Sequence, residues 1–187
     1  MNKLKAKCTL LALILTSSTF ALPSIPALRK SPEFTINDPS GKTELLSSLK
    51  GKVVVLEFLF IRSQHCLRVA QTLNKLNAEL GSRGFQPVGV VFDPPNSPGT
   101  GGQLLARMVD YFKLTYPVGY SAKSDVDSYL GRTGKEILNI PQIVVIDRTG
   151  TIRATSGGAG GDPKLEDENS LRSLIDSLLK EDARARH

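Results

Sequence analysis

The sequence VVVLEFLF at residues 53–60 is a nearly unbroken run of β-branched, leucine and aromatic residues that only Glu57 interrupts. Such a run predicts a strand that is covered on both faces. The residues that follow, 63–80, carry apolar side chains three and four positions apart, which predicts a helix that ends near Gly81 and Gly84. A buried strand that leads into a helix is a unit from which α/β folds are built.

The rest of the chain continues this alternation. We expect strands at 34–38, 88–92, 116–118, 143–146 and 151–154, and helices at 105–112, 125–130 and 171–179. The last two strands are joined by the turn Asp147–Gly150 and therefore form a hairpin. The order predicts an α/β fold, a three-layer α/β/α sandwich with a central mixed β-sheet.

The N-terminus predicts a secretory signal peptide. Three lysines precede the short apolar run 10–15, and small residues end at Ala21, where we expect cleavage. The apolar run is too short to span a bilayer, which takes about 20 residues. The expected organisation is a signal peptide at 1–21, a Pro-rich linker at 22–31, a single domain at 32–181 and a C-terminal tail at 182–187. We expect the protein to be exported, either to the periplasm or out of the cell.

Charge gives little support to a nucleic-acid partner. The chain has 24 Lys and Arg against 18 Asp and Glu, a net charge of +6. Cleavage of the signal removes three lysines and no acid, which lowers the net charge to +3. Because the remaining basic residues form no block, we expect neither nucleic acid nor, after cleavage, a membrane as partner.

Cysteine content is the most informative feature of the mature chain. Cys8 leaves with the signal, so Cys66 is the only thiol in an oxidising compartment and has no internal partner for a disulfide. Two alternatives follow. The thiol is either buried and inert, or it reacts with a partner thiol or disulfide.

Four stretches, in order along the chain, resemble the thioredoxin-like superfamily in its TlpA-like and redoxin branch, which is related to AhpC/TSA proteins and peroxiredoxins. They are the segment PEFTINDPSGK at 32–42, GKVVVLEF at 51–58, SQHC at 63–66 and IPQIVVIDRTG at 140–150. The resemblance covers about residues 32–180 and implies a thioredoxin-like sandwich with an N-terminal β-hairpin extension. It also implies a cis peptide bond at Ile140–Pro141, beside the cysteine motif, with Ile140 pairing an extended client chain.

The motif itself departs from the pattern of thiol-disulfide proteins with this fold, which is Cys-x-x-Cys between strand and helix. Ser63 stands in the place of the attacking cysteine, and a hydroxyl without an activating base is a poor substitute for a thiolate. Dithiol reduction or oxidation by this chain alone is therefore excluded. Ser63 and Cys66 also fit the second half of the peroxiredoxin pattern Pro-x-x-x-Thr/Ser-x-x-Cys, but Leu59 replaces its Pro. The peroxiredoxin Arg is missing near Pro141, although Arg62 and Arg68 flank the loop.

Two further residues are candidates because of their positions. His65 either stabilises the neighbouring thiolate as an imidazolium or faces solvent without a role. Glu57 resembles the buried acid of thioredoxins and is a candidate general base for Cys66; otherwise it faces solvent or pairs with a lysine.

The expected function is that of an exported thioredoxin-fold redox protein with thiol-dependent oxidoreductase or antioxidant chemistry at Cys66, through a mixed disulfide or a sulfenic acid. The alternative is a catalytically inactive module that binds extended peptides or a partner protein. The candidate catalytic residues are Cys66, His65, Ser63 and Glu57, and the candidate substrate-binding residues are Ile140 and Pro141.

We expect no cofactor, because the Gly-rich stretches at 99–102 and 157–161 lack the residues of nucleotide loops, and no metal, because one Cys beside one His does not form a ligand set. The expected partner is a protein or small molecule that carries a thiol or disulfide.

Overall fold

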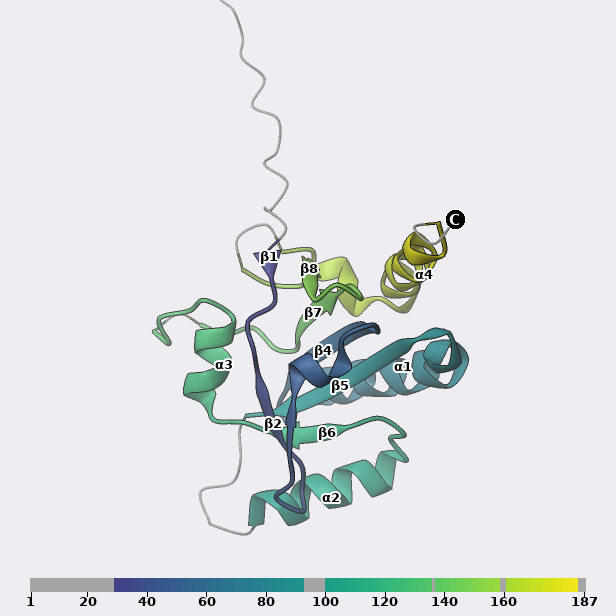
Figure 1. The fold of residues 1–187 in the computed structure, drawn as a ribbon. Helices are drawn as coiled ribbons and strands as arrows, with labels where there is room; N and C mark the ends of the chain where they lie inside the picture. Colours follow the sequence, from purple (N-terminus) through teal and green to yellow (C-terminus); the bar gives the residue numbers. More distant parts are fainter. Residues whose placement is uncertain (1–28, 93–99, 136, 159–160, 185–187) are drawn as a thin grey trace, which may run out of the picture.

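The computed structural model describes residues 29–92, 100–135, 137–158 and 161–184 (Figure 1). The expected signal peptide, most of the linker and the loop at 93–99 lie outside these residues. The described elements are β1 (Arg29–Lys30), β2 (Thr35–Asn37), β3 (Thr43–Leu45), η1 (Leu46–Leu49), β4 (Val53–Leu59), α1 (Gln64–Leu80), η2 (Gly81–Arg83), β5 (Phe85–Val91), α2 (Thr100–Phe112), β6 (Val118–Tyr120), α3 (Lys123–Tyr129), β7 (Gln142–Ile146), β8 (Thr151–Thr155), η3 (Pro163–Glu166) and α4 (Glu168–Arg184). No described helix is long and apolar enough to cross a membrane.

The strands form one mixed sheet in the order β1-β8-β7-β4-β5-β6-β2-β3. At its centre, β4 pairs with β5 in parallel and with β7 antiparallel, and all seven of its residues are buried. The apolar run at 53–60 therefore forms the doubly covered strand that the sequence predicts, because neighbouring strands satisfy its backbone and side chains cover both of its faces.

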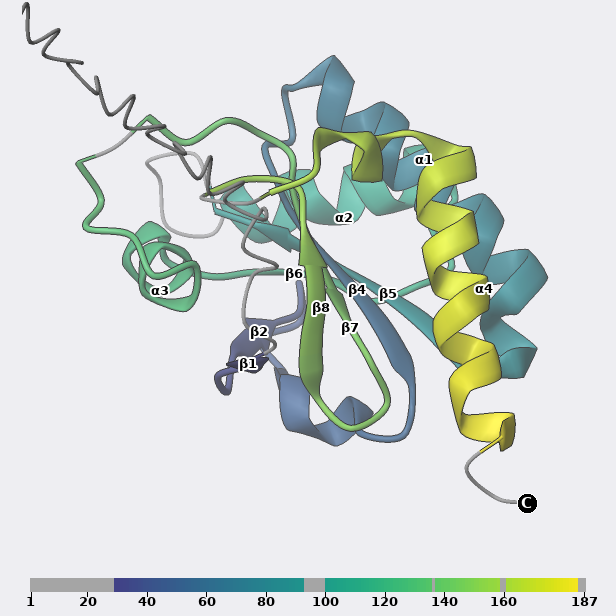
Figure 2. The same cartoon turned by 90° about the horizontal axis from the view of Figure 1, so that it is seen from above.

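Alternate residues of β4 belong to two cores. Val53, Val55 and Leu59 pack with α1, α2 and α4, whereas Val54, Leu56 and Phe58 pack with η1, α3 and Phe34. Figure 2 shows α1 and α4 on one side of the sheet and α3 on the other. The predicted three-layer α/β/α sandwich is confirmed.

Several boundaries differ from the sequence expectation. β2 is shorter than the strand expected at 34–38 and pairs with β3 in the N-terminal hairpin that the resemblance implies, and β5 begins at Phe85 instead of residue 88. β6 begins at Val118, after Pro117, and Tyr116 is instead a core residue whose hydroxyl donates to the carbonyl oxygen of Ala70, 3.2 Å away. Proline has no N–H to donate to a ladder, which explains why this strand starts after it. The residues of β1, which we expected to be part of the linker, instead form a short strand that pairs with β8.

A glycine in β6 fixes how closely β2 approaches it. A Cβ at Gly119 would lie 2.4 Å from Cγ2 of Ile36 and 2.6 Å from the backbone oxygen of Asn37. Since Asn37 pairs with Tyr120 in the sheet, the backbone of β2 cannot easily move away from Gly119.

We therefore expect Gly119→Ala to lower the free energy of unfolding by about 1–3 kcal/mol, the usual cost of overpacking. Urea unfolding measures this effect. Gly102→Ala, in the first turn of α2, is the control. A Cβ there lies 3.3 Å from the backbone oxygen of Pro39, a tight contact that a shift of a few tenths of an ångström relieves, and alanine favours a helix. Equal stability of the Gly119→Ala variant and the parent would contradict the close packing of β2 on β6.

Candidate functional site

The junction between β4 and α1 places Cys66 in the first turn of a helix. Ser63 is the N-cap of α1, and its side-chain oxygen accepts the backbone N–H of Cys66 at 3.4 Å. Ser63 therefore satisfies one of the free N–H groups of the helix N-terminus, a role that serine performs well. The positive end of the helix dipole lies at the same place, which favours negative charge on a thiol there.

Cys66 is fully buried, with 0% of its surface exposed. It belongs to the core between the sheet and α1, α2 and α4. Exposure was the quantity that the sequence left open, and the structure resolves it in favour of burial. In this conformation the Cys66 sulfur is not accessible to solvent.

The short helix η3 lies against the start of α1. Its residue Glu166 places Oε2 at 2.8 Å from Nε2 of His65, and its neighbour Leu165 is buried in the same core as Cys66. His65 is 47% exposed and is directed to this carboxylate. The ring therefore faces outward and has a partner, and a role of His65 in stabilising the Cys66 thiolate stays a prediction.

Glu57 lies on the same face of β4 as Val55 and Leu59 and therefore points into the core that contains Cys66. It is 0% exposed, and neither carboxylate oxygen has a hydrogen-bond partner among the described residues. The flanking positions on β5 and β7, Gly89 and Ile143, offer no polar side chain. The alternatives of a solvated or lysine-paired acid are wrong.

Burial raises the pKa of Glu57 well above its ordinary value, because ionisation would place an unpaired charge in an apolar core. Burial also raises the pKa of Tyr116, and the nearby Glu57 raises it further. Tyr116 donates its hydroxyl proton to Ala70, one helical turn beyond Cys66. Glu57 thus points into the core that contains Cys66, and Tyr116 belongs to that core and contacts α1 at Ala70.

The peptide bond Ile140–Pro141 is cis, as expected. The antiparallel register of β4 and β7 pairs Phe58 with Gln142, so one step further Pro141 lies beside Leu59, at the end of β4 that leads to Ser63. Ile140 is half-buried and packs against both cores. The fold therefore brings the cis-proline turn to the strand end that carries the cysteine motif.

The peroxiredoxin pattern finds little support in side-chain placement. Leu59 is buried at the position of the proline, while Arg62 and Arg68 are exposed. Within the described ranges, no three His, Cys, Asp or Glu side chains gather as metal ligands would. The sequence offered a signal for the start of η3, because Asp162 caps it and Pro163 follows, but no signal that η3 would contact His65.

Comparison with known proteins agrees with this geometry. The model of the AhpC/TSA family matches residues 28–155. A thioredoxin-family thiol:disulfide interchange protein from Chlorobium tepidum superposes with a TM-score of 0.62 at 20% identity, covering 81% of this chain and 97% of that one. The thioredoxin domain of a thiol-disulfide oxidoreductase from Bacteroides vulgatus gives 0.60 at 22% identity, covering 79% and 96%. A thiol:disulfide interchange protein from a Bacteroides species gives 0.60 at 23% identity, covering 79% and 88%. These solved structures establish the thioredoxin-like fold. No curated protein sequence matches the chain.

Proposed function

We propose, since the chain belongs to the AhpC/TSA family, that it is an exported thioredoxin-fold protein whose redox group is the single thiol of Cys66. The observation that carries the proposal is the position of Cys66 in the first turn of α1, with Ser63 as the cap and Glu57 in the same core. A helix N-terminus stabilises a thiolate, and a carboxyl in that core is available as a proton acceptor.

Two reactions are open to one thiol. The Cys66 thiolate attacks one sulfur of a disulfide, forms a mixed disulfide and releases the other sulfur as a thiolate. Alternatively it attacks a peroxide oxygen, the O–O bond breaks, the released oxygen leaves as water or an alcohol, and Cys66 becomes a sulfenic acid. An outside thiol then condenses with the sulfenic acid and water leaves. In both cases the partner carries a thiol or disulfide, because the mature chain has no second thiol to react with Cys66.

The other site residues have supporting roles in this proposal. Glu57, with its raised pKa, is a stronger base than an ordinary carboxylate once it is ionised, and it takes the proton of the Cys66 thiol. Ser63 keeps the helix N-terminus formed. The backbone at Ile140, ahead of the cis Pro141, binds an extended segment of the partner.

Access to Cys66 requires a local opening, because its side chain is fully buried. The segment η3 is the cover best suited to move. It is four residues long, it contains one buried apolar side chain, Leu165, and its contact with His65 involves a half-exposed side chain, where such a contact contributes little. Burying one leucine contributes only about 1.5–3 kcal/mol, so such an opening is far less costly than unfolding.

A second candidate function is favoured by the same burial. If η3 does not open, Cys66 is a core residue, Ser63 is only a cap, and the protein is a catalytically inactive module that binds an extended peptide or partner at Ile140. Thiol reactivity under native conditions separates the two candidates.

We expect glutathione disulfide or dilute peroxide to modify Cys66 slowly in the folded protein, as detected by intact mass, in a Cys8→Ser background that leaves one thiol. Leu165→Ala is expected to speed the reaction about tenfold or more, because truncating a buried leucine removes well over the 1.4 kcal/mol that corresponds to tenfold. Lys164→Ala, an exposed neighbour in η3, is the matched control and should leave the rate unchanged. No adduct in the folded protein, together with full labelling once it is unfolded, would favour the inactive module.

A further inference from the structure

A pocket of about 440 Å³ lies away from the cysteine site, at the other end of the central strand. It is enclosed by the N-terminal arm at 30–33, by η1, and by the turn between β7 and β8. Val54, near the start of β4, lines it, whereas the cysteine motif follows Leu59 at the end of β4. Five residues of extended strand separate these positions by roughly 16 Å.

The floor of the pocket is apolar. Leu46, Leu49, Val54 and Ile146 line it, and each of them is at most 7% exposed. They belong to the core on the η1 side of the sheet. This floor is a rigid surface that would favour the apolar body of a ligand, because burying such a body removes it from water.

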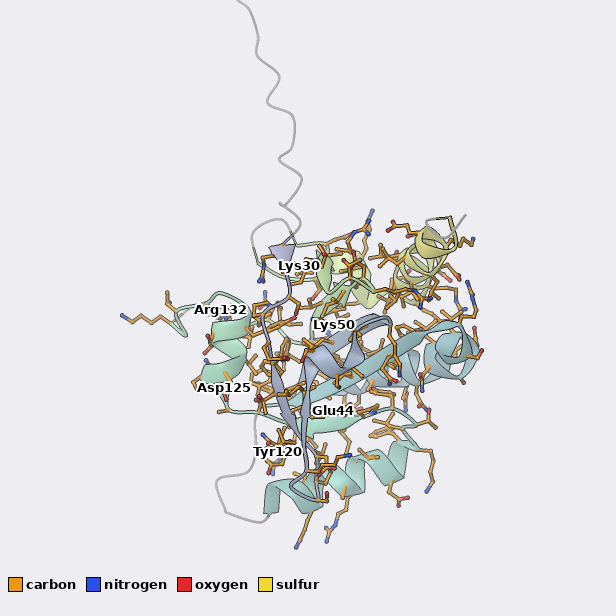
Figure 3. All side chains as sticks on the ribbon, in the orientation of Figure 1. Lys30, Glu44, Lys50, Tyr120, Asp125 and Arg132 are labelled. Atoms are coloured by element: carbon orange, nitrogen blue, oxygen red, sulfur yellow. The ribbon has the colours of Figure 1, made fainter. Side chains whose placement is uncertain are left out.

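The rim carries three lysines, Lys30, Lys50 and Lys52. Figure 3 labels Lys30 on β1 and Lys50 directly after η1. Lys30 donates to neutral oxygens of Thr149 and Thr151 at 3.0 Å, and Lys52 donates to the amide oxygen of Gln86 at 3.1 Å. Within the described part of the chain none of the three lysines forms a salt bridge, so their positive charge is not neutralised by direct contact.

The two acids that line the pocket are engaged elsewhere. Glu33 accepts the backbone N–H groups of Phe34 and Ser47, each at 3.0 Å. Asp147 accepts backbone N–H groups within its own turn and pairs with Arg153 at 3.3 Å. The charge of Lys50 also helps to lower the pKa of Glu33, so this acid partly balances one rim lysine. The lining as a whole keeps an excess of one positive charge, three lysines against two acids.

We propose that this pocket binds a small amphiphilic anion, with a carboxylate or phosphate head at the lysine rim and an apolar body on the leucine and isoleucine floor. Its volume lies within the usual range of ligand pockets, about 300–1,000 Å³. A neutral ligand would leave the excess positive charge of the rim without a counter-charge, and a simple inorganic anion would leave the apolar floor uncovered. The amphiphilic anion matches both parts.

The protein is well suited to a fluorescence test because it contains no tryptophan. The probe is anilinonaphthalene sulfonate, an apolar aromatic anion, titrated into the folded full chain. We expect saturable binding with one site, weakened by added salt because the rim lysines are exposed to solvent. Lys50→Gln and Lys52→Gln are each expected to weaken binding about threefold, and the double variant about tenfold, since each removes one surface charge.

Lys42→Gln is the charge-matched control, because Lys42 is an exposed lysine in the β2–β3 turn that does not line the pocket. Its affinity should equal that of the parent. Octanoate and octyl phosphate distinguish the two head groups by the concentration at which each displaces the probe, and octanol tests whether the charge is needed. Displacement by octanol as readily as by both anions, or equal binding in the double lysine variant and the Lys42→Gln control, would overturn the proposal.

Discussion

Ser63→Cys is expected to give the chain an internal disulfide and measurable turnover of a dithiol-disulfide reaction that the parent lacks. A serine hydroxyl takes no part in disulfide exchange, so the activity of the parent is at background. Ser63 Oγ already lies 3.4 Å from the backbone nitrogen of Cys66, and residues three apart at a helix start share one face. A sulfur at position 63 would therefore lie within the short reach that a disulfide requires.

The test uses a Cys8→Ser background, an oxidising glutathione buffer, and insulin reduction as the turnover assay. Ser63→Ala is the control, since it removes the cap without adding a thiol and should cost about 1 kcal/mol of stability while remaining inactive. If the Ser63→Cys variant stays reduced and inert towards a disulfide substrate, Cys66 is misdirected for exchange, and the inactive binding module becomes the better description.

Glu57→Gln is expected to remove a large pH dependence of stability. Below the ordinary glutamate pKa of 4.5, the carboxyl is protonated in both the folded and the unfolded protein. Above it, the unfolded state ionises first, because burial raises the pKa of Glu57 in the folded state. The free energy of unfolding therefore falls as pH rises, by up to about 1.4 kcal/mol per pH unit, until the pH reaches the folded pKa.

Chemical denaturation between pH 5 and 8 measures how the free energy of unfolding changes with pH. The difference in this slope between the parent and the Glu57→Gln variant is the contribution of Glu57. Glu57→Leu extends the test, since it replaces a buried carboxyl that has no hydrogen-bond partner among the described residues and should raise stability at pH 8. Glu44→Gln, in the exposed β2–β3 hairpin, is the control and should reproduce the slope of the parent. A slope unchanged by Glu57→Gln would mean that water or a rearranged core already solvates the carboxylate.

The two experiments test different residues of the proposed site, the helix cap Ser63 and the buried acid Glu57. Ser63→Cys tests whether the geometry of the helix N-terminus still suits disulfide exchange, and Glu57→Gln tests whether the core supplies a carboxylate that takes the proton of the Cys66 thiol. A Glu57→Gln variant that loses its pH slope and also slows glutathionylation of Cys66 would assign Glu57 a chemical role. Loss of the slope alone would leave it a buried acid without one.

The sequence by itself determined the architecture. The apolar run at 53–60 specified a strand buried on both faces, and the spacing of apolar residues after Ser63 specified the helix that covers it. Local composition is sufficient here, because a short run of β-branched and aromatic residues favours a strand, whereas apolar residues three and four positions apart lie on one face of a helix. The turn of the β7–β8 hairpin was also readable, since Asp and Gly favour turns locally. The cis bond at Pro141 was expected from the resemblance to thioredoxin-like proteins, because local sequence alone favours a trans bond before proline.

Only the tertiary structure decided the state of the functional groups. The burial of Cys66, the absence of a partner for Glu57 among the described residues and the contact of Glu166 with His65 all depend on segments far apart in the chain. The same holds for the pocket, whose lysines come from positions 30, 50 and 52 and meet a turn near residue 149. Solvent exposure and electrostatic environment are properties of what packs around a residue, and that is set by the folded chain as a whole.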